Sequence, residues 1–204
     1  MDNNFNRVQL CGTVDSAPEL SHINHGVSFY KFTLAVERLS GLADKLTVIV
    51  SAPQLEAVPL REGDTVTVRG QLRSFNNKSG QGSRLVISVF AHVLEKGGEA
   101  PLNVIQLSGV LCKPPVLRRT PLGREISDII LAVNRRYGRA DYLPCIAWDA
   151  VAQQTAAMTT GDRLTIEGRV QSRTYTKVEN GVSTERTAYE VSIMRPALLE
   201  EFLF

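Results

Sequence analysis

The sequence predicts an all-β protein built from two tandem β-barrels, and three observations support this fold class. The chain contains an internal repeat, apolar and polar residues mostly alternate within each copy, and one helix-favouring segment interrupts that alternation at the same place in each copy. Hydrophobic residues make up 43% of the 204 residues and charged residues 22%, which is ordinary for a globular chain. Both halves can therefore bury a core.

The repeat consists of three sequence blocks that recur in the same order. The matched pairs are 6–14 with 103–111, 32–36 with 129–133, and 63–70 with 161–168. The first two pairs are offset by 97 residues and the third by 98, so one inserted residue separates the two registers. Three ordered blocks indicate a duplicated domain. A stretch containing Gly and Pro at 96–101 divides the copies, and we expect domains at 1–99 and 100–204.

The order of elements within each copy predicts the kind of barrel. Alternation, as in residues 65–68, is typical of half-buried strands. It stops before each Gly-Asp turn, at 54–60 and 149–158, where Ala, Leu and Gln favour a short helix. Each copy then has the order strand, strand, strand, helix, strand, strand, which is that of the OB-fold, a five-stranded Greek-key barrel. Four glycines interrupt the strand patterns, where we expect bulges or tight bends: Gly12, Gly70, Gly109 and Gly168.

Charge is distributed unevenly between the two halves. The net charge is only +2, but residues 1–99 carry 10 basic and 10 acidic side chains, whereas residues 100–195 carry 13 basic and 9 acidic ones. Eleven of those 13 are arginine. The second half is therefore the better candidate for binding a polyanion.

Several classes of protein are excluded by what the sequence lacks. No apolar stretch approaches the ~20 residues of a membrane-spanning helix, and the first residues do not resemble a secretory signal. We therefore expect a cytoplasmic, nucleoid-associated protein without membrane contact. Cys11, Cys112 and Cys145 show no metal-ligand spacing and are expected to pack in the interior.

An enzyme is not expected. The sequence contains no P-loop, HExxH or GxSxG pattern. His22 and His25 have i,i+3 spacing, but they lie in a predicted hairpin loop without accompanying cysteines, so we expect neither a metal site nor a cofactor.

The second copy resembles the bacterial single-stranded-DNA-binding protein family. Its matching blocks are 103–109, 120–123, 132–135, 141–148, 161–162 and 168–175. The resemblance covers about residues 103–193, and the first copy shows it more faintly. Two copies on one chain are similar to the double-domain members of this family, which assemble as homodimers with four barrels. The resemblance therefore implies sequence-tolerant binding of single-stranded DNA, in replication, recombination or repair, by a homodimer.

Family members stack bases on aromatic side chains of the barrel face, and the matching positions here are all aromatic: Tyr137, Tyr142, Trp148 and Tyr175. Such stacking is sequence-tolerant because every base has a π-face. The alternative is that these rings are core or cross-strand packing residues. Cations that accompany the rings are candidates to contact phosphates: Arg118, Arg119, Arg124, Arg135, Arg136, Arg139, Arg169, Arg173 and Lys177. Of these, Arg135, Arg139 and Arg173 are the first choices.

The first copy departs from this pattern. Ser40, Leu46 and Ala52 are expected at the positions of Tyr137, Tyr142 and Trp148. The nearest remaining rings are those of Phe75, Phe29 and Tyr30, with Arg73 among the nearby cations. The first barrel is thus expected to bind DNA weakly or to pair with another subunit.

Residues 196–204 resemble a shortened form of the acidic, hydrophobic tip with which family members recruit replication and repair proteins. A short apolar cap folded back on the barrel is the alternative. Two other functions stay open: an adaptor similar to primosomal replication protein N, acting mainly through protein contacts, and an OB-fold protein that binds RNA.

Overall fold

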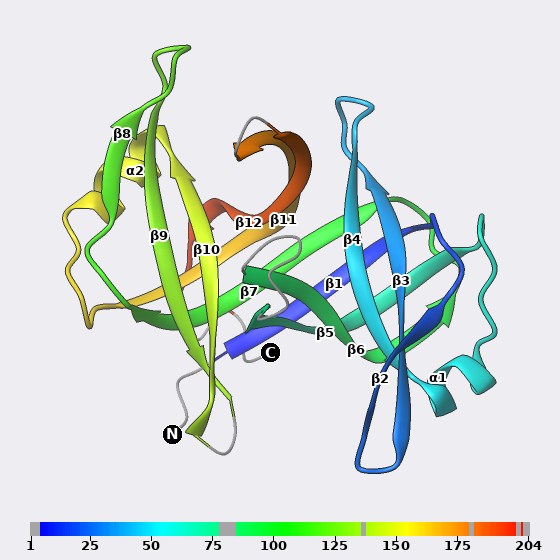
Figure 1. Ribbon diagram of the computed structural model, residues 1–204. Helices are drawn as coiled ribbons and strands as arrows, with labels where there is room; N and C mark the ends of the chain where they lie inside the picture. The colour runs from blue at the N-terminus through cyan, green and yellow to red at the C-terminus, as the bar shows by residue number, and fades with distance from the viewer. Residues whose placement is uncertain (1–4, 78–84, 136–137, 180–181, 199–200, 202–204) are drawn as a thin grey trace. The chain divides into compact units, whose positions relative to one another are not determined.

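The computed structural model describes residues 5–77, 85–135, 138–179, 182–198 and 201. The chain divides into two compact units, each with one barrel (Figure 1). The first comprises Arg7–Arg73 and Ile87–Val104. The second comprises Ile105–Phe204 together with Met1–Asn6 and Ser74–Val86. Ser74, on a strand of the first repeat, thus belongs to the unit of the second barrel.

The first repeat forms a closed sheet. Its elements are β1 (Phe5–Val14), β2 (Glu19–Asn24), β3 (Val27–Glu37), β4 (Ala43–Ser51), α1 (Ala52–Ala57), β5 (Thr65–Asn76) and β6 (Leu85–Lys96). The strands follow the order β2-β3-β4-β6-β5-β1. A further pairing of β1 with β3, which places Thr13 opposite Ala35, closes the barrel.

The second repeat has the same topology. Its elements are β7 (Leu102–Leu111), β8 (Val116–Arg119), β9 (Glu125–Asn134), β10 (Ala140–Trp148), α2 (Asp149–Ala156), β11 (Arg163–Glu179) and β12 (Val182–Pro196). The order is β8-β9-β10-β12-β11-β7, and β7 closes the barrel on β9 through Val110 and Ala132. In both repeats the strand before the helix pairs in parallel with the last strand of the repeat, β4 with β6 and β10 with β12. This arrangement confirms the predicted all-β class with a short helix in each barrel.

The structure adds one strand to the expected order. In the described residues, β2 and β8 precede β3 and β9, so four strands rather than three precede each helix. All side chains of these two strands are exposed. An edge strand exposed on both faces has no alternating pattern, so the hydrophobic periodicity could not reveal it.

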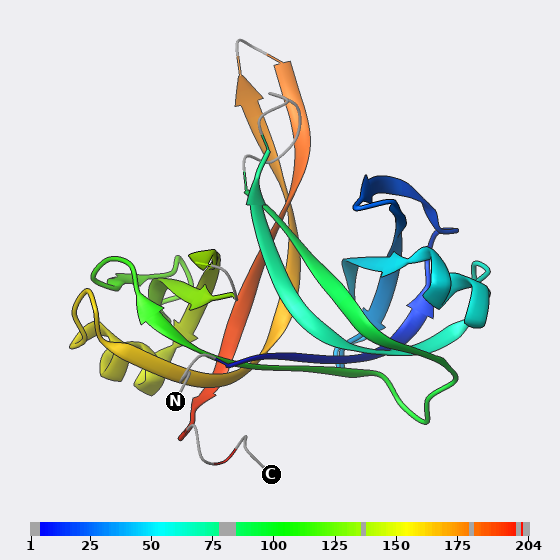
Figure 2. The same ribbon diagram turned by 90° about the horizontal axis from the view of Figure 1, so that it is seen from below.

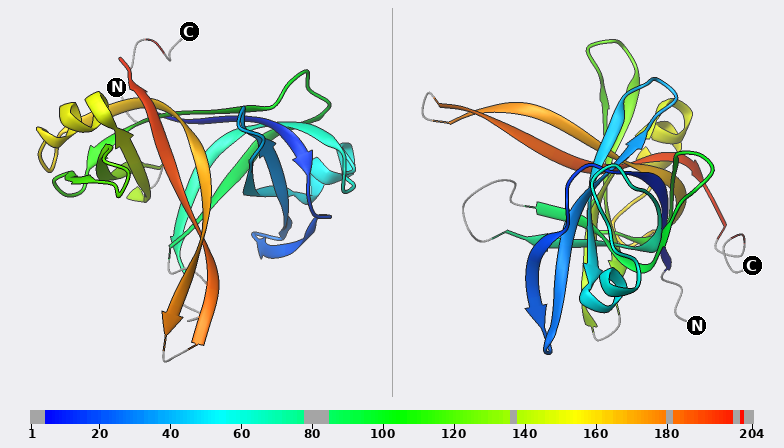
Figure 3. Two further views of the ribbon diagram at one scale, coloured as in Figure 1. Left: turned by 90° about the horizontal axis from the view of Figure 1, so that it is seen from above. Right: turned by 90° about the vertical axis from the view of Figure 1, so that its right-hand side faces the viewer.

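The helices form where they were predicted, with shifted ends. Ser51 and Gln54 make a capping box at the start of α1, which satisfies backbone donors at that end. The longer α2 packs against β9 and β10 at one end of its barrel (yellow in Figure 3, left). No described helix has the length and apolar character needed to cross a membrane.

Alternation places the cores as expected. Leu10, Leu34 and Leu131 are among the fully buried side chains. Cys11 and Cys145 are buried, as predicted, but Cys112 is exposed, so the prediction that all three cysteines pack inside is wrong. Cys112 directly follows Leu111, the last residue of β7.

The four strand glycines mark close crossings of the backbone. A Cβ on Gly109 would lie 2.4 Å from the carbonyl oxygen of Ala132, and one on Gly168 would lie 2.3 Å from that of Ser192. Gly12 and Gly70 would meet backbone oxygens at 2.3 and 2.1 Å. Gly168 also lies at an irregularity of the ladder between β11 and β12. Close strand approach, rather than bending alone, therefore explains these glycines.

Candidate nucleic-acid interface

Strand β10 carries two aromatic side chains on its outer face. Tyr142 and Trp148 are six residues apart, and side chains at even spacing point to the same side of a strand. Leu143 and Cys145, at alternate positions, are buried in the core. Tyr142 is 53% exposed, whereas Trp148 is half-buried. At ~3.3 Å per residue the two rings are about 20 Å apart, which leaves room for several nucleotides.

The position of Trp148 is fixed by contacts on two sides. Its indole Nε1–H donates to the Ser192 hydroxyl oxygen at 3.2 Å. The guanidinium carbon of Arg124 lies 4.6 Å from the centre of the indole ring, within the range of a cation–π contact. Arg124 is itself paired with Asp149 at 2.6 Å. Trp148 is therefore a rigid ring with a cation stacked on it.

Tyr175 lies on a two-stranded ribbon formed by β11 and β12. The two strands pair without interruption from Gly168 opposite Ile193 to Glu179 opposite Val182. They extend away from the sheet of their barrel (orange in Figure 2). Tyr175 is 37% exposed and pairs with Arg186 across the ribbon. The guanidinium carbon of Arg173, two residues before it on the same face, lies 5.8 Å from the ring centre. A ring and a cation thus project together from the ribbon.

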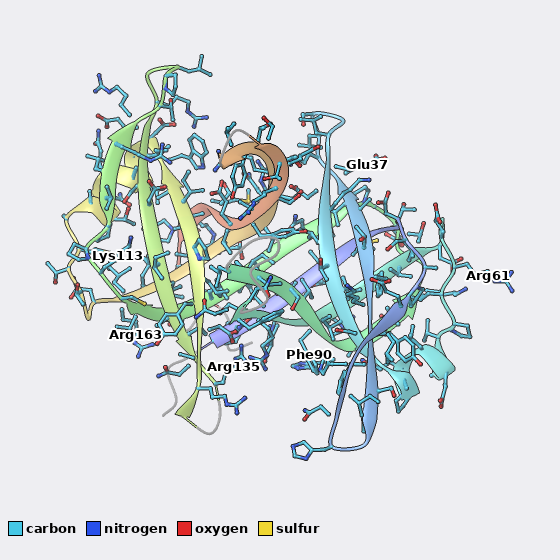
Figure 4. All side chains as sticks on the ribbon, viewed as in Figure 1. Glu37, Arg61, Phe90, Lys113, Arg135 and Arg163 are labelled. Atoms are coloured by element: carbon cyan, nitrogen blue, oxygen red, sulfur yellow. The ribbon has the colours of Figure 1, made fainter. Side chains whose placement is uncertain are left out.

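Arg135 belongs to a buried network rather than to the exposed surface. Its Nε donates to Asp141 Oδ2 at 2.6 Å, and its terminal nitrogen donates to Asp141 Oδ1 and, at 3.0 Å, to the Ser74 carbonyl oxygen. Arg135 is labelled in Figure 4. The Asp141 carboxylate is fully buried and also accepts the Ser74 N–H. The Ser74 hydroxyl accepts the N–H of Tyr142 at 2.8 Å. The network therefore holds the backbone of Tyr142 in place.

Most of the other candidate arginines have partners within the protein. Arg118 pairs with Asp128, Arg119 pairs with Glu125 at 3.1 Å, and Arg169 lies against the amide of Gln171. The hydrogen bond to Asp128 raises the pKa of Arg118. These pairs are exposed, so they are weak and their arginines can exchange a carboxylate for a phosphate.

Arg139 and Arg173 differ from these arginines because neither forms an ion pair within the described part of the chain. Both are exposed. Three further candidates, Arg136, Tyr137 and the side chain of Lys177, lie outside the described residues.

Strand register corrects the expected correspondence between the two repeats. Phe32 pairs with Val48 in the first barrel, and its counterpart Ile129 pairs with Cys145 in the second. The offset of 97 therefore continues through β4 and β10, and the inserted residue falls later, where α2 is longer than α1. Lys45 and Ser51, rather than Leu46 and Ala52, occupy the positions of Tyr142 and Trp148.

The candidate rings of the first repeat are spread over several strands. Phe75 on β5 is 56% exposed, whereas Phe29 and Tyr30 on β3 are half-buried. Arg73 donates to the side-chain oxygen of Gln71. His22, expected in a loop, lies in β2, and only His25 lies in the turn, with a φ of 47°. His22 in fact contacts Phe29, which local sequence patterns did not indicate.

No group of three potential metal ligands occurs among the described residues. Near the C-terminus, residues 199–200 and 202–204 lie outside the described part. Glu201 accepts the N–H of Leu198 at 2.8 Å and pairs with Arg195 at 2.6 Å, and these bonds lower the pKa of its carboxyl group. One of the two glutamates of the expected acidic tip is thus bound to the end of β12.

Comparisons with known proteins match this arrangement. Residues 102–197 match the model of the single-strand binding protein family. Single-stranded DNA-binding protein B of Bacillus subtilis is 36% identical over 104 residues, covering 46% of this chain and 91% of that protein. The single-stranded DNA-binding protein of Thermus thermophilus is 28% identical over 207 residues, covering 86% of this chain and 78% of that one.

The same fold occurs in a solved structure, the wild-type single-stranded DNA binding protein from Thermus aquaticus. It superimposes with a TM-score of 0.77 at 24% identity, over 95% of this chain and 92% of that one. The fold thus agrees over nearly the whole length, and the sequence match to the Bacillus protein is strong over nearly all of that relative. The chain belongs to the single-strand binding protein family.

Proposed function

We propose that this protein binds single-stranded DNA with little sequence preference and protects it during replication, recombination or repair. The observation that carries the proposal is the pair of rings on β10. Tyr142 is exposed and held at its backbone by the Ser74 network, and Trp148 is fixed by Ser192 and Arg124. Rigid rings on one face of a strand suit the stacking of successive unpaired bases.

Stacking also explains why the strand must be single. A base in a duplex is already stacked and paired, so its face is unavailable to a side chain unless the duplex opens. Each base stacked on an aromatic ring contributes ~1–3 kcal/mol irrespective of its identity. Tyr142, Trp148 and Tyr175 together would therefore give appreciable affinity without sequence selection.

The phosphates of the bound strand would be neutralised by the arginines around these rings. Arg139 and Arg173 are exposed and without an internal ion pair among the described residues, and Arg118, Arg119 and Arg124 can exchange their carboxylates. Because each neutralised phosphate of a single strand contributes a slope of about −0.7 to the dependence of log affinity on log salt, binding should weaken steeply with salt.

The assembly that we propose is a homodimer with four barrels, at the nucleoid in the cytoplasm. Two barrels per chain and the resemblance to double-domain family members support it. Sedimentation equilibrium should give a mass of about twice the 22.4 kDa of one chain. A mass of one chain at micromolar concentration would contradict the dimer without affecting the proposal of DNA binding.

The experiment that tests the function is a titration with fluorescent oligo-dT at low and high salt. Trp148 is the only tryptophan, so its emission reports on the second barrel, while anisotropy of the oligonucleotide reports on binding. We expect tight, salt-sensitive binding with quenching of Trp148, and much weaker binding to a duplex of equal length. Equal affinity for duplex and single strand would overturn the proposal, and an oligo-U competitor measures the preference for DNA over RNA.

A further inference from the structure

Four aromatic side chains form a continuous row on the first barrel. The ring of His22 on β2 stacks on Phe29 of β3, with centroids 5.0 Å apart and an angle of 9° between the planes. Phe29 contacts Phe90 of β6, which is labelled in Figure 4, with ring centroids 5.7 Å apart, and Phe90 contacts His92 with centroids 5.8 Å apart. The two phenylalanines are half-buried and the two histidines are exposed. The sheet thus supports the row, and solvent can reach its two ends.

The row lies on the face that corresponds to the Trp148 face of the second barrel. Phe29 pairs across the sheet with Ser51 of β4. Ser51 is the repeat counterpart of Trp148, as the strand registers above show. The small side chain of Ser51 leaves space over β4, and rings from the strands on either side of β4 meet there.

The two barrels carry an aromatic residue and a serine on the same pair of neighbouring strands, but each residue type stands on the opposite strand in the other barrel. In the first barrel, Ile49 of β4 pairs with Phe90 of β6. At the equivalent place in the second barrel, Ile146 of β10 pairs with Ser192 of β12. The second barrel therefore has Trp148 on β10 beside Ser192 on β12, in hydrogen-bond contact. The first barrel has Ser51 on β4 and Phe90 on β6. By position in the repeat, the first barrel has lost the aromatic residue, because Ser51 replaces Trp148. In the structure, Phe90 supplies a ring from the neighbouring strand.

Cations lie on the same face as the row. Lys31 is two residues after Phe29, and Lys45 is six residues before Ser51, so both project to that side. Lys45 is 61% exposed and pairs with Asp15, and Lys31 pairs with Glu19 at 3.0 Å. These exposed pairs can yield to phosphates.

The imidazole of His92 is also suited to stacking. Burial and, to a smaller extent, the positive charge of Arg73 lower its pKa, which favours the neutral form of the ring. A neutral, planar imidazole can stack on a base in the same way as the other rings of the row.

We propose that His22, Phe29, Phe90 and His92 form a second stacking platform for unpaired bases of single-stranded DNA. The platform occupies positions different from those of the second barrel, and the flanking lysines complement the charge of the backbone. This proposal rests on the proposed function, because its ligand is the same strand. The sequence led us to expect that the first barrel binds DNA weakly or pairs with another subunit, and Phe29 was the one residue of the row among its candidate rings.

The chain provides a separate reporter for each barrel. All three histidines lie in the first repeat and the single tryptophan lies in the second. The full-length protein is titrated with oligo-dT of about 30 nucleotides, which exceeds the ~4–16 occupied per OB-fold. Imidazole Hε1 signals are followed by NMR at pH 7.5, and Trp148 emission is followed in parallel. We expect the His22 and His92 signals to shift upfield, whereas the signal of His25, which lies in the turn between β2 and β3, should shift little.

The outcomes separate the two proposals. Quenching of Trp148 at saturation with unchanged His22 and His92 signals would overturn the second platform and leave the proposed function intact. No response from either reporter, with no change in anisotropy, would overturn both.

Matched variants test the energetic contribution of the row. His22→Ala and His92→Ala remove exposed rings, Phe90→Leu keeps apolar volume, and His25→Ala is the control. We expect each row variant to weaken binding of the long oligonucleotide about fivefold or more, because a stacked base is lost, while His25→Ala changes nothing. Circular dichroism verifies folding. Wild-type affinity in folded His22→Ala/His92→Ala and Phe90→Leu proteins would contradict the proposal.

Discussion

The Arg135 guanidinium donates two hydrogen bonds to the fully buried Asp141 carboxylate, and the same arrangement recurs in the first barrel between Arg38 and Asp44. Both pairs are related by the offset of 97 residues. In the second barrel, Asp141 also accepts the N–H of Ser74, and Arg135 also donates to the Ser74 carbonyl oxygen. A conserved arrangement within the repeat, with a buried acid, indicates a structural role for these arginines.

Arg135→Ala should therefore destabilise the protein rather than simply weaken binding. Removing one partner of a buried ion pair leaves an uncompensated charge and costs about 3–5 kcal/mol. We expect the urea concentration at the midpoint of unfolding to fall in proportion to this loss of free energy, with an unchanged m-value. The matched control is Arg139→Ala, which removes an exposed arginine of the same strand connection.

Arg139→Ala is expected to leave stability unchanged, to weaken binding of single-stranded DNA and to reduce the salt slope by about 0.7. If instead Arg135→Ala leaves the urea midpoint unchanged and reduces the salt slope, Arg135 contacts phosphate and the structural assignment is wrong.

Tyr142 and Tyr175 are exposed rings whose removal should affect binding alone. Replacing both with Ala removes two stacking surfaces, at ~1–3 kcal/mol each, so affinity for oligo-dT should fall by at least about 30-fold. Fluorescence anisotropy measures the loss. Leu122→Ala is the control, since Leu122 is also apolar and is 91% exposed. A double tyrosine variant that binds as tightly as the wild type would remove both rings from the interface.

Much of the fold followed from sequence because its signals are periodic. The alternating strands and the short helices are visible in residues a few positions apart, and the repeat is visible as blocks matched at offsets of 97 and 98. Tyr142 and Trp148 were named from the resemblance to the family rather than from periodicity, and their role in binding stays a prediction. Edge strands β2 and β8 were missed because exposed strands have no such period.

The parts that sequence did not predict depend on contacts between distant residues. Arg135 has the surroundings of a surface cation, and only its contacts with Asp141 and Ser74 reveal its role. The ring row needs four side chains from three strands, and no local pattern connects His22 with Phe90. Leu46 and Ala52 correspond to an offset of 96, whereas the matched blocks on either side give 97 and 98, so that assignment was misaligned by one residue. The pairing of β3 with β4 gives Lys45 and Ser51 instead.

The cysteines should differ sharply in reactivity. Cys11 and Cys145 are buried, and burial raises the pKa of the Cys145 thiol far above its ordinary value. Cys112 is exposed, although partial burial of its sulfur raises its pKa as well. Because the thiolate is the reactive form, one thiol should react with Ellman's reagent in the native protein, increasingly fast as pH rises above neutral.

The other two thiols should react only after unfolding. Cys112→Ser should abolish the native reaction, which identifies the reactive site. Rapid reaction of two or more thiols in the folded protein would show that a barrel core opens readily.

Gly109 tests the barrel closure directly. Its Cα passes so close to β9 that an added Cβ would lie 2.4 Å from the Ala132 oxygen and 2.9 Å from the Leu131 side chain. The adjacent Val110 pairs with Ala132 at the closing contact between β7 and β9. Since the nearest obstacle is backbone, relief requires the two strands to separate. Gly109→Ala should therefore lower the free energy of unfolding by about 3 kcal/mol, at the upper end of overpacking costs.

Gly123→Ala provides the contrast for this variant. An added Cβ there meets no atom within 4 Å, but the residue has a φ of 84°. Backbone strain alone costs roughly 1–2 kcal/mol, so the loss should be smaller and binding should be unchanged. Urea unfolding followed by circular dichroism measures both variants. Because β9 also pairs with β10, separation of β7 from β9 should displace Tyr142 and weaken DNA binding in Gly109→Ala. A variant as stable as the wild type would show that the strands do not approach this closely.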